Sequence, residues 1–582
     1  MNGKQPKKPK DRSQKHTRTV GSHPRRLSRR AFMGHMMTGT VAATILAKTG
    51  MAAVQRARTT LVVIGDSAER GFFIGRADAE PTNMVHTGFA RKNGTTGSMF
   101  SALARELPSS KNGTLKVNSD GTLVTVYKLK SGLTWHDGKP LTARDFVLGW
   151  KVMNDPKVPW RGSAGSRLAS SVAAPDDLTV VIQWQKPHWS SAALGMIDLV
   201  PLPNHVLEES YRTGDYDALT KLPYWNRRFI GAGPYKVVEF GEGDQLTLEA
   251  FDNYALGRPK IDRLVYRFIP DRNSALAGIL SGEIDVSLNS ALGFDQAMVA
   301  QQQWEAKGKG KVYFSPNSWA GVIPSRLKDW FRDVRVRQAL LHAVDREKMV
   351  QTLFGGRLQV AHFMMSPKNP AFPEAYRRAS KYEYNPAKAK QLFMEAGWKP
   401  GPDGTLVNGK GERFAVDGVT EAGNKELEQV QAATIAHWKA VGVEVQIKNV
   451  TRRQIADEER RANPPTLQWR ERNNSDEYFY TQLSSANIPK AEDKYAGQNF
   501  AGWNNPRADE ITNRLEEILL QPGARLLKAE LMRLLSQDLP WLPLYYFSEH
   551  VTVRSNVKGV EPRQAAGVRN ATVWNIHRWE KV

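Results

Sequence analysis

The sequence predicts an α/β protein with two lobes joined by a hinge, and three observations lead to this prediction. The chain has 582 residues, too many for one hydrophobic core, so two or three domains are expected. Strand-like stretches alternate with helix-like stretches along most of the chain, which is typical of α/β folds. A late apolar stretch, residues 541–547 (WLPLYYF), could return the chain to the first lobe after a second lobe has been built.

The positive charge is concentrated near the N-terminus. The formal net charge is +23, and residues 1–58 alone hold 14 Lys or Arg and one acidic residue. The rest of the chain is mildly basic and has no dense Lys/Arg run, whereas a nucleic-acid interface needs a clustered basic face. We therefore expect no nucleic-acid partner.

The chain contains no cysteine, which narrows its chemistry. Disulfides, thiolate metal sites, cysteine-ligated iron–sulfur clusters and cysteine nucleophiles are excluded. A lipid-modified cysteine after a leader is excluded as well. We expect a protein that is not lipid-anchored.

The N-terminal segment matches the pattern of a twin-arginine export signal. Ser28-Arg29-Arg30-Ala31-Phe32 fits S-R-R-x-F, and the apolar run at residues 36–47 follows it. That run is too short to span a bilayer, which needs about twenty residues. We predict that residues 1–55 are a signal peptide, read by the twin-arginine export machinery, and that the folded chain reaches the periplasm.

Element signals can be assigned in chain order. In the first part we expect strands at 59–64, 179–184, 199–202, 264–268 and 284–288, a hairpin at 231–249, and helices at 99–107 and 273–280. In the second part we expect helices at 333–353, 386–396, 426–441, 509–520 and 525–539, and a strand at 443–447.

Residues 124–147 (VTVYKLKSGLTWHDGKPLTARDFV) predict a rigid corner. Alternation gives a strand, Asp137-Gly138 gives a turn, and Thr142 with Asp145 resembles a helix capping box. Trp135 lies between strand and turn, where an aromatic ring can hold the two together. We interpret His136 and Asp137 as corner residues rather than as an acid–base pair.

The stretch LKSGLTWHDGKPLTARDF, residues 129–146, resembles the signature segment of family 5 solute-binding proteins, the peptide- and nickel-binding components of bacterial ABC importers. Further stretches resemble the family in the same order: GAGPY at 231–235, SGEID at 281–285, DVRVRQAL at 333–340 and YNP at 384–386 with AGW at 396–398. The resemblance implies the two-lobed periplasmic binding protein fold with an extra small domain.

The resemblance also implies a domain plan in which the first lobe is discontinuous. The expected parts are lobe I at 56–97, the small domain at 98–195, lobe I again at 196–308, lobe II at 309–543 and the return to lobe I at 544–582. The ligand would lie between the lobes, and permease subunits of an ABC importer would be partners of a monomer.

Enzyme signatures are missing from the sequence. There is no H-E-x-x-H, no G-x-S-x-G and no Walker loop, and Lys236 stands where a dinucleotide fingerprint after Gly231-Ala232-Gly233 needs a glycine. We expect no enzyme activity, no cofactor and no metal site, although a cofactor enzyme exported by the twin-arginine route stays open as an alternative.

The stretch 468–479 (QWRERNNSDEYF) departs from the family pattern. Peptide-binding members carry a Trp here and then a carboxylate that holds the peptide ammonium, whereas this chain places Arg472 at or beside the acid. Three alternatives stay open. Glu471 or Asp476 replaces the acid and the ligand is a peptide, the arginines bind an anionic opine- or sugar-phosphate-like solute, or the charges lie on a solvated loop.

The ligand-binding residues expected by resemblance come from several segments. They are Trp469, Arg470, Glu471, Arg472 and Asn473 in lobe II, Tyr545 and Tyr546 in the return strand, Asn289 at the exit from lobe I, and Trp160 and Arg161 in the small domain.

Overall fold

The computed structural model describes residues 58–65, 72, 80–158, 164–241, 245–289, 291–326, 328–455, 457–463, 467–473, 476–493, 495, 497–518, 522–563 and 571–582. The predicted signal peptide lies outside the described residues.

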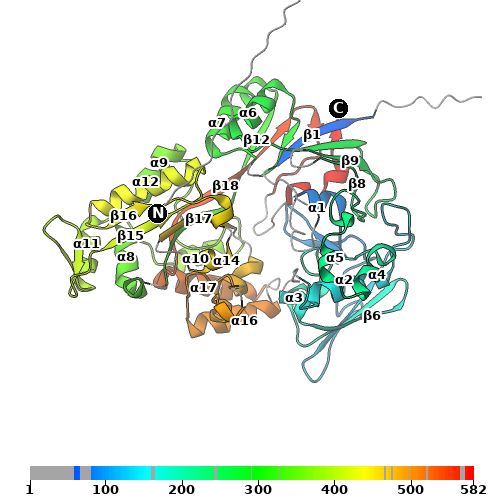
Figure 1. Cartoon of the computed structure of the whole chain (residues 1–582), viewed down its shortest axis with the longest axis horizontal. Coiled ribbons are helices and arrows are strands. Elements are labelled where there is room, and N and C mark those ends of the chain that lie inside the picture. The colour runs from blue at the N-terminus through cyan, green and yellow to red at the C-terminus, as the bar shows by residue number, and fades with distance from the viewer. Residues whose placement is uncertain are drawn as a thin grey trace, which may run out of the picture. The chain divides into compact units, whose positions relative to one another are not determined.

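A ten-stranded mixed sheet is the central element (Figure 1). Its strands, in spatial order, are β16 (Glu444–Ile447), β15 (Ala415–Val419), β17 (Leu467–Asn473), β12 (Gly310–Pro324), β18 (Leu542–Arg554), β11 (Val286–Ser287), β1 (Thr60–Gly65), β10 (Arg263–Phe268), β9 (Gln245–Ala250) and β8 (Tyr235–Phe240). We call the end built on β1 and β8–β11 lobe I, and the end built on β15–β17 lobe II. The long antiparallel pair β12 and β18 connects them, as expected for a hinge.

Two further groups of strands extend lobe I. A four-stranded sheet contains β4 (Leu115–Val117), β5 (Leu123–Lys128), β7 (Thr179–Trp184) and β6 (Ala169–Asp176). Two-stranded pairs are β2 (Ala90–Lys92) with β3 (Met99–Ser101), and β19 (Val557–Lys558) with β20 (Glu580–Lys581). One apolar core runs from the ten-stranded sheet into the four-stranded sheet, so residues of the predicted small domain share their core with lobe I.

The lobe I helices are α1 (Glu80–Val85), α2 (Ala143–Asn154), α3 (Ala164–Arg167), α4 (Asn204–Arg212), α5 (Tyr216–Thr220), α6 (Arg272–Ser281) and α7 (Phe294–Gln303). The end of α6 follows the sequence signal, because Gly282 adopts φ 82° and closes the helix in the left-handed region. Gly282 precedes β11, so this cap helps to set where the chain re-enters the sheet.

Helices cover both faces of the sheet in lobe II. They are α8 (Val334–His342), α9 (Arg346–Phe354), α10 (Phe372–Arg378), α11 (Pro386–Glu395), α12 (Lys425–Lys439), α13 (Arg452–Ile455), α14 (Glu458–Ala462), α15 (Phe479–Leu483), α16 (Pro506–Ile518) and α17 (Ala524–Asp538), with the hairpin β13 (Trp398–Pro400) and β14 (Leu406–Asn408). One apolar cluster includes residues of α8, α9, α11 and α12, and another includes residues of α10 and α15–α17. β17 lies between these clusters and therefore has two different environments.

Three element predictions are wrong. Residues 99–107 form the short strand β3 and then bends, and residues 199–202 pair with no strand. The helix expected over 333–353 is two helices, because the Asp345 side chain accepts a hydrogen bond from the Lys348 N–H and starts α9. Apolar periodicity continues through this break, which is why periodicity alone missed it.

The corner at residues 124–147 is a scaffold in the structure. Asp145 accepts hydrogen bonds from the Thr142 N–H at 2.7 Å and from the buried Trp135 indole at 3.3 Å. His136 Nδ1 accepts from the Gly231 N–H at 3.1 Å, so Nε2 donates to the Gly233 carbonyl at 3.1 Å. Burial lowers the pKa of His136 to about 3, and a neutral imidazole fits both contacts.

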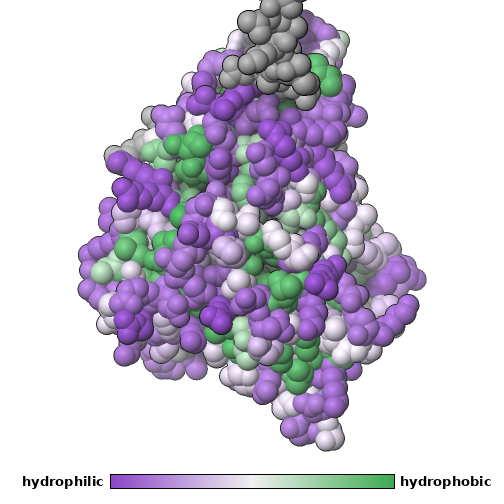
Figure 2. Space-filling model, turned by 90° about the vertical axis from the view of Figure 1, so that its right-hand side faces the viewer, coloured by the Kyte–Doolittle hydropathy of each residue, from purple (hydrophilic) through white to green (hydrophobic). Residues whose placement is uncertain are grey.

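In the described part of the chain, no helix is both long enough and apolar enough to cross a membrane. On the face shown in Figure 2, hydrophilic residues predominate and hydrophobic residues lie in small separate groups.

Candidate ligand-binding site

A cavity of about 440 Å³ lies between the two lobes. Lobe I contributes the segment after β10 and the starts of α6 and α7, and lobe II contributes the β15–α12 turn, the start of α12 and Glu471 of β17. Phe547 of the connecting strand β18 also lines it. A cavity of this size, lined by both lobes beside the connecting strands, is suited to a small ligand.

The strand register explains how side chains reach this cavity. Glu471 of β17 pairs with Ala320 of β12, which pairs with Tyr545 of β18. Paired residues on adjacent strands point to the same face of a sheet. Glu471 and Tyr545 therefore lie on one face with the small side chain of Ala320 between them, which leaves space above the strand.

Glu426 completes this group from the first turn of α12. Its helix begins at Asn424, whose side chain accepts from the Leu427 N–H at 3.3 Å. Glu426 is 8% exposed, accepts from the Phe294 N–H of lobe I and lies beside the Tyr545 hydroxyl. Burial raises the pKa of Glu426 to about 7, against the opposing influence of the Arg272 charge.

Glu471 titrates above its ordinary range for the same main reason. Burial and, to a smaller extent, the neighbouring Glu426 raise the pKa of Glu471 to about 8, against the opposing charge of Arg272. Two carboxyls that face each other across a low-dielectric cavity cannot both ionise easily. The pair therefore holds protons at pH values where isolated carboxyls have lost them.

The two arginines predicted with Glu471 lie on the opposite face of the sheet. Arg472 pairs with Trp319, which pairs with Tyr546, one position along the same three strands. The Arg472 guanidinium lies 4.6 Å from the Phe500 ring centre and 5.3 Å from that of Trp541. Arg470 shares this face by alternation, so the arginines and Glu471 belong to different surroundings.

The second acid considered at this position, Asp476, is engaged within lobe II. Both of its carboxylate oxygens accept from the Asn369 amide, at 2.7 and 2.8 Å, and Lys528 Nζ lies 2.7 Å away. Its side chain is 17% exposed. These contacts anchor the segment after β17 and place Asp476 in a structural role.

The other predicted residues are dispersed. Trp469 is fully buried in the lobe II core, with its ring centre 5.5 Å from that of Trp438. The buried Tyr546 donates to the Phe363 carbonyl at 3.2 Å, and the Asn289 side-chain oxygen accepts from the Thr572 hydroxyl at 3.3 Å. Asn473 ends β17, and Trp160 and Arg161 lie outside the described residues.

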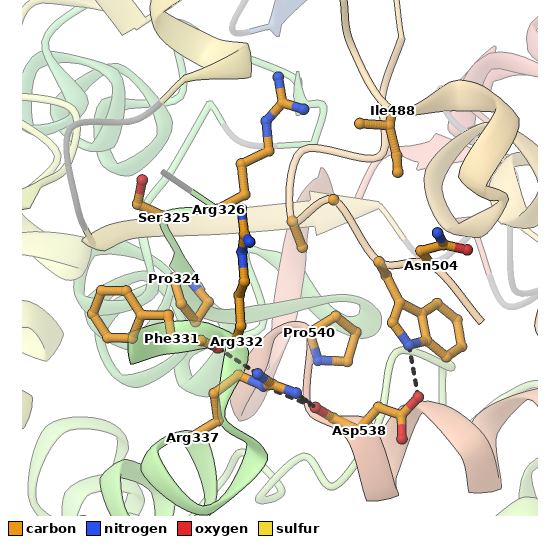
Figure 3. A pocket seen from close by; sticks show the side chains of 13 residues that line it. Pro324, Ser325, Arg326, Phe331, Arg332, Arg337, Ile488, Asn504, Asp538 and Pro540 are labelled. Atoms are coloured by element: carbon orange, nitrogen blue, oxygen red, sulfur yellow. Dashed lines mark hydrogen bonds between the residues drawn. The ribbon is translucent and has the colours of Figure 1, made fainter. Parts of the chain in front are cut away.

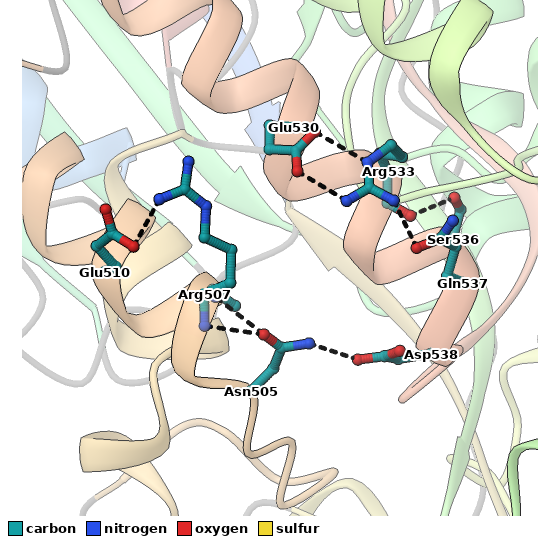
Figure 4. A network of polar contacts seen from close by, with 9 residues as sticks. Asn505, Arg507, Glu510, Glu530, Arg533, Ser536, Gln537 and Asp538 are labelled. Atoms are coloured by element: carbon teal, nitrogen blue, oxygen red, sulfur yellow. Dashed lines mark hydrogen bonds and ion pairs between the residues drawn. The ribbon is translucent and has the colours of Figure 1, made fainter.

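A larger cavity, about 690 Å³, belongs to lobe II alone (Figure 3). Arg337 donates to the Asp538 carbonyl at 2.6 and 2.9 Å, and the Asp538 side chain accepts from the Trp503 indole at 2.8 Å. The neighbouring polar network continues through Asn505 to α16 and α17 (Figure 4). Its charged groups serve lobe II packing, so we place the ligand site in the cavity that both lobes line.

Sequence reasoning missed two residues of the site, Glu426 and Arg272. Glu426 had a weak signal as an acid in the first turn of a helix that begins at Asn424, but such acids are common as partners of the helix dipole. Arg272 begins α6 in lobe I and approaches the carboxyl pair across the cavity. No spacing in the sequence connects residue 272 with residues 426 and 471.

Within the described part of the chain, no group of three or more His, Asp or Glu is placed to hold a metal ion. The two-lobed α/β fold with an inter-lobe cavity defines a solute-binding protein. The family model of bacterial extracellular solute-binding proteins, family 5, middle region, matches residues 102–493, and the chain belongs to this family.

Relatives and solved structures extend the similarity beyond the matched region. The chain is 28% identical over 474 residues to the oligopeptide-binding protein AppA of Bacillus subtilis, covering 79% of this chain and 81% of AppA. The structure of B. subtilis AppA with a nonapeptide matches with TM-score 0.73 and 24% identity, over 90% of this chain and 99% of that one. NikZ of Campylobacter jejuni with Ni(L-His) matches with TM-score 0.74 and 20% identity, over 90% and 99%.

Proposed function

We propose that this protein is the solute-binding component of an ABC importer and that it captures a peptide or peptide-like solute between its lobes. Membership of family 5 and the similarity to a B. subtilis oligopeptide-binding protein support this function. The observation that carries it is the 440 Å³ cavity lined by both lobes beside the connecting strands.

Capture would proceed by closure of the lobes about β12 and β18. A contact far from these strands supports this motion, because His188 Nε2 lies 3.3 Å from a carboxylate oxygen of Glu516 on α16. The neighbouring Trp189 packs against the lobe II helices. A ligand that touches both lobes favours the closed form only through its preference for that form.

The lining of the cavity supports a peptide over an anionic solute. Arg470 and Arg472 do not line it, and five of its seven charged side chains are acidic. An opine- or sugar-phosphate-like ligand would need the arginine face of β17, where Arg472 already lies over two aromatic rings. We therefore do not propose the anionic ligand.

The proposal includes export and partners. Twin-arginine export to the periplasm rests on Arg29, Arg30 and the apolar run after them. The mature protein would act as a monomer that delivers solute to the permease subunits, without a cofactor and without catalysing a reaction. Replacing Arg29 and Arg30 with Lys should retain the protein in the cytoplasm, and unchanged export would remove this part of the proposal.

The test of ligand class is native mass spectrometry of protein purified from periplasm, followed by titration calorimetry with synthetic peptides. We expect a copurifying peptide mass that is lost on partial unfolding, and micromolar or tighter binding of at least one peptide. A copurifying non-peptide solute together with no peptide binding would refute the proposal.

A further inference from the structure

We propose that the inter-lobe cavity selects a cationic group of the solute, an ammonium or guanidinium, and holds it between Glu426 and Glu471. This inference rests on the proposed function and specifies which chemical feature of the solute the site recognises. It assigns a specificity role to Glu426, which the sequence did not connect with Glu471, and to Tyr545, which the sequence expected among the ligand-binding residues.

The charge of the cavity is opposite to that of the chain. The chain carries a formal +23, whereas the cavity is lined by two basic residues, Arg272 and Lys425, and five acidic ones, Asp271, Asp295, Glu421, Glu426 and Glu471. A cavity with low-dielectric walls and one sign of charge concentrates ligands of the other sign. A cation is therefore the favoured occupant.

The Glu426 carboxyl keeps unused acceptor capacity at the point where the cation would bind. The Phe294 N–H and the Tyr545 hydroxyl are its neighbours, whereas a carboxylate offers about four acceptor positions, and the two side chains are only 8% and 0% exposed. A buried acceptor that is not fully supplied with donors destabilises the empty site. An ammonium or guanidinium supplies several donors and no acceptor, which suits a carboxyl pair.

Arg272 provides the resident counter-charge but does not balance the pair. Its charge opposes the raised pKa of both Glu426 and Glu471, so it lies close to both. One guanidinium facing two carboxylates leaves a net negative charge when both are ionised. A second cation can therefore enter without displacing Arg272. It would bind the two lobe II carboxyls beside this lobe I arginine.

The apolar part of the lining suits the stem of a lysine or arginine side chain. Phe294, Phe354 and Phe547 line the same cavity as the carboxyls. Long basic side chains commonly place their methylene groups against apolar surface while the charged end contacts polar partners. The cavity volume of about 440 Å³ accommodates such a side chain together with adjacent backbone.

Protons compete with the cation for the two carboxyls. Burial raises the pKa of Glu426 to about 7 and that of Glu471 to about 8, so at neutral pH the empty pair is partly protonated. A bound cation favours the ionised forms and releases protons. The affinity for a lysine ammonium or a guanidinium, which stays charged over this range, should therefore rise between pH 6 and pH 8.5, by up to about tenfold per pH unit where one proton is released.

The experiment compares matched probes by calorimetry on the full-length mature protein at pH 7.5, where both the lysine side chain and most of the terminal amines of the probes are charged. The probes are Ala-Lys-Ala, the analogue in which norleucine replaces lysine and removes the side-chain charge, Ala-Glu-Ala, N-acetylated forms of each, and the diamine cadaverine. We expect that removing the recognised cation, either the lysine ammonium or the terminal ammonium, weakens binding at least tenfold. In the Glu426→Gln and Glu471→Gln variants, the affinities for the probe that carries the cation and for the probe that lacks it should differ by less than threefold.

Glu444→Gln is the matched control, since it removes a carboxylate from the same lobe at an exposed ion pair with Arg413. It should keep the tenfold preference. Tyr545→Phe removes the hydroxyl beside Glu426 with little change of volume and provides a second variant if Glu426→Gln fails to fold.

Each outcome decides the inference. Peptide binding with equal affinity for lysine, norleucine and acetylated probes, or a preference for Ala-Glu-Ala, overturns the cation site and leaves the proposed function intact. Cadaverine binding that depends on Glu426, with no peptide binding, supports the cation site and refutes the peptide. No binding of any probe overturns both.

Discussion

His188 and Glu516 should control how readily the lobes close. The two side chains are only 3% and 11% exposed, and they join the segment before the turn Trp189–Ala192 to helix α16 of lobe II. His188 Nδ1 accepts from the Ser190 N–H at 3.2 Å, so the neutral ring carries its proton on Nε2 and donates it to Glu516. The contact therefore does not need a protonated histidine.

The magnitude follows from this hydrogen bond to a charged group. In His188→Ala the closed form keeps a nearly buried Glu516 carboxylate without its donor, whereas water solvates that carboxylate in the open form. A hydrogen bond to a charged group contributes about 1.5–3 kcal/mol. Because about 1.4 kcal/mol corresponds to a factor of ten, the closing equilibrium should fall about 10- to 150-fold.

The absence of cysteine makes the assay direct. Spin labels on cysteines introduced at the exposed Lys116 and Lys439 report the distance between the four-stranded sheet and lobe II. The closed population and the affinity for ligand should fall together in His188→Ala. A double-mutant cycle with Glu516→Ala separates the pair from local effects on the turn.

The control is His205→Ala, which removes another histidine–carboxylate contact. His205 Nε2 lies 2.7 Å from an Asp137 carboxylate oxygen, and the two side chains are 31% and 30% exposed. It should leave closure unchanged. A coupling energy between His188 and Glu516 below about 0.5 kcal/mol, or an unchanged distance distribution, would refute the argument.

Three further predictions concern stability and ligand class. Arg346→Met leaves the buried carbonyls of residues 361, 382 and 543 without their donor. Urea denaturation should show a free energy of unfolding that is lower by about 3–5 kcal/mol, and a decrease below about 1 kcal/mol would contradict this prediction. Because the folded-state pKa values of Glu426 and Glu471 are raised to about 7 and 8, the folded chain holds protons that the unfolded chain has released between about pH 4.5 and 8. The free energy of unfolding should therefore fall as pH rises through this window, less steeply in Glu426→Gln, and a rise would disprove the assignment. Arg472→Ala should keep the affinity for a cationic peptide within twofold and cost about 1 kcal/mol of stability through lost aromatic contacts, whereas a large loss of ligand affinity by calorimetry would return the arginine face to the site.

Much of the fold could be predicted because its signals are local. Asn385 with Pro386 starts α11, the alternation at residues 231–249 forms the hairpin of β8 and β9, and Gly282 ends α6. The prediction failed at 99–107, where a helix-compatible stretch pairs through β3 with β2. Pairing with a strand elsewhere in the chain overrode the local preference there.

The candidate site was only half predictable. Residues Trp469–Asn473 were expected to bind ligand by resemblance, but the sequence did not predict that they form the strand β17, and it placed Glu471 and its arginine neighbours in one group. In the structure, strand alternation places Glu471 on the cavity face and Arg472 against Phe500 and Trp541. Which face meets the cavity depends on the helices that cover each side, and those come from distant parts of the chain.

The sequence by itself determined the family, the α/β class, the exclusion of cysteine chemistry and the approximate bounds of several helices, among them α6, α11, α12, α16 and α17, because motifs, composition and caps act over a few residues. Only the tertiary structure decided the chemistry of the cavity. The register of β17, β12 and β18 aligns Glu471 with Tyr545 across Ala320, and the packing of α6 and α12 brings Arg272 and Glu426 to them. Burial of that group raises the pKa of its carboxyls, and burial results from contacts between segments that are far apart in the sequence.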